Sequence, residues 1–121
     1  MTFGGSWDNQ PLAVTEFQNA TIYRSKFDLT NVTQARVVVN YVGGGAASAK
    51  IRAQFSTDQS SWTYLDGAAG PSVTLSAAGL NVSPWINIQS GAKSDVFLRI
   101  VGLDGNGAAD PAFSRIDIQV K

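Results

Sequence analysis

Oxygen-bearing side chains gather in residues 103–111, LDGNGAADP. Counted from Asp104, this glycine-rich loop has Asp104, Asn106 and Asp110 at positions one, three and seven. Calcium prefers such a loop, because a flexible backbone can wrap six or more oxygens at about 2.4 Å from the ion. The match is partial, since Ala108 stands at position five and no glutamate closes the loop. The segment is either a calcium site or an Asx-type turn, and we favour the turn.

Carboxylate pairs are the other candidates for chemistry. The chain has nine carboxylates, and two of them about 5 to 9 Å apart could act on a glycosidic bond. Most sit beside Gly, Asn, Ser or Thr in expected turns, where solvated carboxylates are the ordinary case. The chain has no histidine and no cysteine, which removes Cys/His zinc sites, Ser-His-Asp and Cys-His pairs and the commonest general base. We therefore expect no enzymatic activity.

Three aromatic residues could bind sugars. Trp62, Tyr64 and Trp85 could form a stacking platform of the kind that exposed aromatic rings provide in carbohydrate-binding β-sandwiches. Aromatic residues in strands more often belong to the core, where each can bury about 150 Å² or more. We favour packing over sugar binding for this set.

The segment 55–67, FSTDQSSWTYLDG, resembles the Asp-box hairpin of sialidases through Ser56, Asp58 and Trp62. It departs from that motif at Ser60, where the motif has glycine, and it has one residue fewer before the aromatic. In the motif the aspartate caps the turn, so even a full match is a folding device. A sialidase would also need several repeated blades, and no repeat of fixed period occurs here. The segment therefore predicts a hairpin.

The elements that position these residues are strands. Short alternating runs recur about every 8 to 12 residues, separated by Gly, Asp, Asn, Ser and Pro. The clearest are residues 50–56 and 115–121. In the first run, one face carries Ile51, Ala53 and Phe55. In the second, the alternation predicts Ile116, Ile118 and Val120 inward and Arg115, Asp117 and Gln119 outward.

Two longer runs, residues 35–42 and 95–103, are apolar on both faces, which is typical of central strands. Weaker strand candidates are residues 12–18, 21–29, 61–66, 72–76 and 84–89, and no window predicts a helix. The total is eight or nine strands. This number favours an all-β, antiparallel two-sheet β-sandwich of jelly-roll-like form over a small barrel.

Length and charge limit the partners. The 121 residues suit one domain, which we expect over residues 13–121, and no apolar run approaches the roughly 18 residues of a membrane span. We expect a soluble protein without a secretion signal or a membrane partner. Charged residues form only 15% of the chain, and nine basic groups balance nine acidic ones. Because the lysines and arginines are scattered, we expect no nucleic acid partner.

Residues 1–12 differ from the rest, because they hold Phe3 and Trp7 but have no period. They are either an N-terminal arm that lies across a neighbouring subunit or the edge strand of a sheet. We expect an arm, with Phe3 and Trp7 as candidate partner-binding residues.

From residue 35 onward the order of segments resembles tailed-phage virion proteins. The resemblance lies in AKIRAQFSTDQSSWTYL, a VTLS loop, SPWINI and DVFLRIVGLDGNGAADPAFSRIDIQV. It implies a jelly-roll-like sandwich of the kind found in capsid decoration (cement) proteins and in tail or fibre proteins. It brings no set of functional residues with it.

The resemblance implies a non-enzymatic protein that is made in the host cytoplasm and binds the outer surface of the virion. The expected partners are the major capsid protein and copies of the chain itself, with a homotrimer favoured. Two alternatives stay open. One is a tail or fibre component that adsorbs through Trp62, Tyr64 and Trp85, and the other is a carbohydrate-binding module that uses calcium at Asp104, Asn106 and Asp110.

Overall fold

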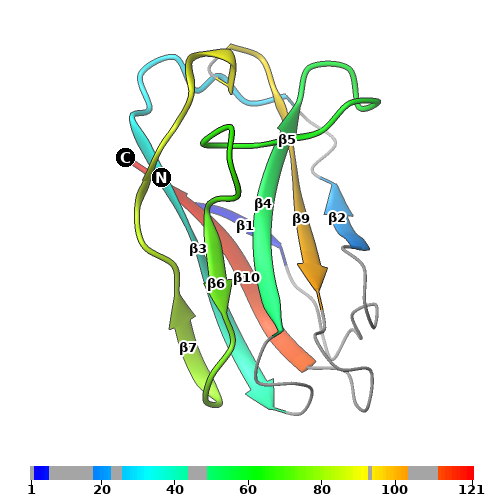
Figure 1. Cartoon of the computed structure of the whole chain (residues 1–121), viewed down its shortest axis with the longest axis vertical. Helices are drawn as coiled ribbons and strands as arrows, with labels where there is room; N and C mark the ends of the chain where they lie inside the picture. The colour runs from blue at the N-terminus through cyan, green and yellow to red at the C-terminus, as the bar shows by residue number, and fades with distance from the viewer. Residues whose placement is uncertain (1, 6–17, 23–25, 44–48, 93, 104–111) are drawn as a thin grey trace.

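The computed structural model describes residues 2–5, 18–22, 26–43, 49–92, 94–103 and 112–121 (Figure 1). This part of the chain holds ten strands in two antiparallel sheets, and one 3-10 turn, η1 (Ser90–Ala92). Sheet A has the order β1 (Thr2–Gly5), β10 (Ala112–Val120), β3 (Gln34–Gly43) and β7 (Gly79–Val82), and β8 (Ile86–Asn87) also pairs with β3. Sheet B has the order β2 (Gln18–Ile22), β9 (Phe97–Leu103), β4 (Lys50–Ser56) and β5 (Thr63–Tyr64), and β6 (Ser72–Thr74) also pairs with β4.

The strand order is that of a jelly roll. Strands β7 and β8 both pair with β3, and β5 and β6 both pair with β4. If each of these two pairs is counted as one interrupted strand, the order is 1-8-3-6 in sheet A and 2-7-4-5 in sheet B. Two Greek keys wound into facing sheets give this order. The predicted all-β, jelly-roll-like sandwich is confirmed. Ten strands form where we expected eight or nine. Strand β7 lies outside every predicted run, and β1 lies in residues 1–12, for which we expected an arm.

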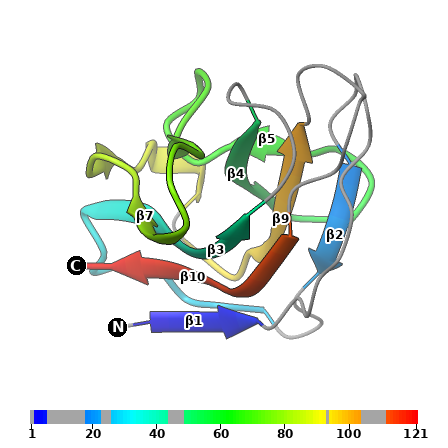
Figure 2. The same ribbon diagram turned by 90° about the horizontal axis from the view of Figure 1, so that it is seen from below.

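The core lies between the two sheets, which Figure 2 shows as separate layers. The predicted inward sets are confirmed: Ile51, Ala53 and Phe55 of β4 and Ile116, Ile118 and Val120 of β10 are all buried. The two runs that are apolar on both faces form most of β3 and β9. Each of these strands has neighbours on both sides, so they are central strands as expected.

The outward positions are less exposed than the alternation suggests. Asp117 points to the outer face of sheet A, yet only 7% of it is exposed, because β10 has neighbours on both sides. One carboxylate oxygen, Oδ2, lies 2.8 Å from Nε of Arg115. The other, Oδ1, has no hydrogen-bond partner among the described residues. On the outer face of sheet B, Gln54 and Ser56 are buried as well.

The chain start contributes to sheet A. Thr2–Gly5 forms the edge strand β1, with Phe3 opposite Ile118 in the register with β10. Of the two alternatives for residues 1–12, the edge strand therefore applies to these four residues. Residues 6–12, and with them Trp7, lie outside the described residues, as does the side chain of Phe3.

Candidate functional site

The residues with the chemistry of a metal site are not grouped in the described part of the chain. Within that part, no group of three or more carboxylate, histidine or cysteine side chains could hold a metal ion. The calcium candidates Asp104, Asn106 and Asp110 lie outside the described residues. No helix in the described ranges is long and apolar enough to span a membrane.

The hairpin at residues 55–67 is held by Asp58. Its Oδ1 accepts hydrogen bonds from the main-chain N–H groups of Ser60 at 2.8 Å and Ser61 at 3.0 Å, and from Oγ of Ser56 at 2.9 Å. These bonds, with that from Ser61 the largest cause and that from Ser60 next, lower the pKa of Asp58 below its ordinary value. Asp58 is a turn cap, as predicted. Its Oδ1 accepts all three of these hydrogen bonds from residues of the same loop.

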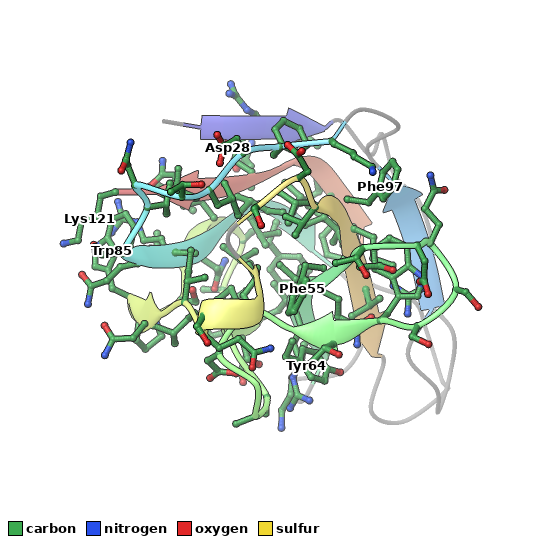
Figure 3. The ribbon with its side chains drawn as sticks, turned by 90° about the horizontal axis from the view of Figure 1, so that it is seen from above. Asp28, Phe55, Tyr64, Trp85, Phe97 and Lys121 are labelled. Carbon is green, nitrogen blue, oxygen red and sulfur yellow. The ribbon has the colours of Figure 1, made fainter. Side chains whose placement is uncertain are left out.

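The three candidate aromatic residues lie against different sheets. Trp62 and Tyr64 lie over the outer face of sheet B, where the Trp62 ring centroid is 4.3 Å from the guanidinium carbon of Arg99. Trp85 lies beside sheet A, with its ring centroid 4.5 Å from the guanidinium carbon of Arg36 and 4.4 Å from Nζ of Lys121. Figure 3 labels Tyr64 and Trp85 on different sides of the molecule. The structure therefore does not join all three residues into one platform.

The outer face of sheet B carries an ordered set of cations and rings, which we call the cation–aromatic strip: Arg52, Gln54, Trp62, Tyr64 and Arg99. Arg99 stacks on Trp62, and its Nε donates to Oε1 of Gln54 at 2.8 Å. Arg52 lies over the Tyr64 ring at 5.4 Å. Burial lowers the pKa of Arg99, and Tyr64 opposes that effect. The guanidinium stays protonated, because arginine is effectively always protonated in proteins.

Sheet A presents a different surface. Val42, Leu80 and Val82, which we call the apolar patch, are 52%, 71% and 41% exposed. Val82 lies opposite Val38 and Leu80 opposite Asn40, which places both side chains on the outer face. Val42 is on the same face, because it is four residues from Val38 along β3. The patch thus spans two neighbouring strands.

Sequence reasoning missed the apolar patch because it did not predict strand β7. The signal was present in the apolar residues at 80 and 82, two positions apart, which share one face of any strand. Their partner run, residues 35–42, was recognised as apolar on both faces, but the sequence alone did not indicate which face meets water.

Comparisons with protein-family models, with curated proteins and with solved structures found no match to this chain. The outer faces of the two sheets are therefore the surfaces from which a function can be inferred.

Proposed function

We propose that this protein is a non-enzymatic structural protein of a tailed-phage particle, a capsid decoration protein that binds the outer shell and stabilises it. The observation that carries the proposal is the apolar patch, which lies on the outer face of sheet A. Exposed apolar patches on soluble domains mark interaction surfaces. The likeness of residues 35–121 to phage virion proteins supports a shell protein as the partner.

The small size of the apolar patch favours binding through several copies of it at once. Burial of a whole Val or Leu side chain contributes about 1.5 to 3 kcal/mol. Scaled by the exposed fractions of Val42, Leu80 and Val82, complete burial of the patch contributes roughly 3 kcal/mol, about a hundredfold in affinity. One copy alone would bind modestly. A trimer that engages three patches on a symmetric shell gains much more through effective concentration, which favours the expected homotrimer.

The two alternatives draw less support from the geometry. In a carbohydrate-binding module, the aromatic rings offer their faces to sugars, whereas Trp62 and Tyr64 each have a guanidinium over the ring. Trp85 lies beside the other sheet. A tail or fibre protein would use the same apolar patch. The identity of the binding partner therefore distinguishes a tail or fibre protein from a capsid decoration protein.

The test compares two variants that add the same charge to opposite sheets. Leu80→Asp alters the apolar patch, and Thr74→Asp, at an exposed position of β6, is the matched control. Both changes are at the surface, so each should alter the free energy of unfolding by less than about 0.5 kcal/mol.

Binding is measured by co-sedimentation with expanded shells of the major capsid protein from the same virus. We expect wild type and Thr74→Asp to bind, and Leu80→Asp to bind at least tenfold more weakly. If wild type fails to co-sediment with these shells, the decoration proposal is wrong. If Leu80→Asp binds as tightly as the control, the apolar patch is not the contact.

A further inference from the structure

Strand β7 is an edge strand of sheet A. It pairs with β3 on one side, and it stands at the end of the strand order β1-β10-β3-β7. Figure 1 shows β7 at the lower left of the molecule, with no described strand beyond it. An edge strand presents unpaired N–H and C=O groups on its outer side, and these can pair with a strand from another chain.

The hydrogen-bond pattern identifies the residues that carry these groups. In an antiparallel pair, residues alternate between positions that bond the neighbouring strand and positions that do not. The N–H of Ser83 donates to the carbonyl of Val37, so the main chain of Ser83 faces β3. The main chain of Asn81, two residues earlier, faces β3 as well. Leu80 and Val82 alternate with these residues, so their N–H and C=O groups point away from β3.

The other side of β3 agrees with this pattern. Gln34 and Lys121 exchange both main-chain bonds, so the even-numbered residues of β3 bond β10. Val38, which lies opposite Val82, therefore bonds β10 and not β7. Among the described residues, none is hydrogen-bonded to the main chain of Leu80 or Val82.

The same two residues carry exposed apolar side chains, since Leu80 is 71% and Val82 41% exposed. Edge strands are usually protected against pairing by a charged residue, a proline or a bulge. Strand β7 has none of these, because its sequence is GLNV and its register with β3 has no shift. The edge is therefore open to pairing.

Strand β7 is complementary to a second copy of itself. If two β7 strands run antiparallel about a two-fold axis at Asn81, Leu80 of one copy lies opposite Val82 of the other. Both N–H groups and both carbonyls at each edge then gain a partner, and the two apolar side chains form cross-strand pairs. Charge does not oppose this contact, because residues 67–92 hold no charged residue and the chain has equal numbers of basic and acidic groups.

We infer that β7 pairs with β7 of a second copy of this chain, which joins two copies of sheet A into one continuous sheet. This inference goes beyond the proposed function and does not depend on it. The pairing uses the main chain of the edge and leaves the side chains of the apolar patch on the outer face, where two patches come together. A two-fold contact is compatible with the favoured homotrimer, since dihedral assemblies combine two-fold and three-fold contacts.

Hydrogen exchange and analytical ultracentrifugation of the whole chain test the pairing, with no shell protein present. As the protein concentration rises, we expect the mass to double. The exchange of the Leu80 and Val82 amides should slow by roughly tenfold over the same range. The Asn81 amide should be protected at every concentration, because it faces β3.

Val82→Pro removes an N–H that points to the free edge and leaves the bonds to β3 in place. Proline is tolerated at such positions of edge strands. The variant should self-associate roughly tenfold more weakly than wild type, because each pair of copies loses hydrogen bonds at both ends of the contact. If wild type is already paired at the lowest concentration, Val82→Pro should halve the mass. Val82→Thr is the matched control, since it keeps the N–H and the branched shape, and it should self-associate within about threefold of wild type.

A constant single-chain mass with unprotected Leu80 and Val82 amides would overturn the inference. Association that leaves these two amides unprotected would also overturn it, since another surface would then be the contact. Protection of both amides at constant single-chain mass would mean that another segment of the same chain covers the edge. Protection that appears only after expanded shells are added would assign the edge to the shell protein and reject a second copy. The wild-type exchange needs no variant, so a misfolded Val82→Pro does not block the test.

Discussion

Replacing Ser83 with alanine should weaken the attachment of β7 to sheet A. Ser83 follows β7 directly, and its N–H donates to the carbonyl of Val37 at 2.9 Å. In return, the N–H of Val37 donates to Oγ of Ser83, also at 2.9 Å. The Ser83 hydroxyl thus accepts the hydrogen bond from Val37 at the point where the strand paired with β3 changes from β7 to β8. Pro84 is the next residue in the chain. Alanine keeps the main chain but removes this acceptor.

The expected cost follows from burial. Val37 is 0% exposed and Ser83 only 3%, so water has little access to the N–H that would lose its acceptor. A buried donor without a partner costs about 1 to 3 kcal/mol. For a domain of this length each kcal/mol shifts the melting temperature by roughly 3 to 5 °C, which gives a decrease of about 3 to 15 °C.

Urea unfolding measures the change in free energy, and hydrogen exchange at the Val37 amide locates it. Ser60→Ala is the control, because Ser60 is exposed and its main-chain N–H makes the bond to Asp58. The control should remain within about 0.5 kcal/mol of wild type. If Ser83→Ala is as stable as Ser60→Ala, or if Val37 exchange is unchanged, the acceptor role of Ser83 is refuted.

Two further predictions concern the core and the hairpin. Phe113 is 0% exposed, so Phe113→Ala should lower the free energy of unfolding by about 3 to 5 kcal/mol in urea titrations, and a loss below 1 kcal/mol would contradict its place in the core. Hydrogen bonds lower the folded-state pKa of Asp58, so its stabilisation is present above the unfolded-state pKa of about 3.9 and is lost as pH falls through the lower folded value. Asp58→Asn should therefore be less stable than wild type at pH 7, by a margin that narrows on acidification to about pH 2. Unfolding curves with equal margins at both pH values would contradict this.

Strands with one buried face were predictable from the sequence. Residues 50–56 were predicted as a strand, and β4 has these bounds, Lys50–Ser56. Alternation with a period of two carries this information whenever the core covers one face of a strand. The prediction of exposure was weaker, because Asp117 and Gln54 lie on outer faces and are still buried by neighbouring strands. Alternation predicts on which face of the sheet a side chain lies. It does not predict how far side chains on neighbouring strands cover it.

The candidate surfaces were less predictable, because they combine strands that are distant in sequence. Trp62 was predicted as a candidate binding residue, but Arg99, on which its ring stacks, lies far away in the sequence. The register between β4 and β9 brings Arg99 beside Gln54, and no local pattern encodes that register. The grouping of Trp62, Tyr64 and Trp85 into one sugar-stacking platform was suggested by residue type alone. Residue type cannot report that Trp85 lies beside the other sheet.

Strand β7 shows why the apolar patch is informative. Its pattern is inverted, since Asn81 points into the sandwich while Leu80 and Val82 point to water. Asn81 is satisfied inside, because its side-chain nitrogen donates to the carbonyls of Ala77 at 2.9 Å and Gly79 at 3.1 Å. Folding alone gains nothing from the exposed Leu80, and the buried amide shows that this orientation is fixed and not a slip of register. Where a local rule is broken at such a site, function is the expected reason. The inversion therefore favours the apolar patch as a contact surface, independently of the likeness to virion proteins.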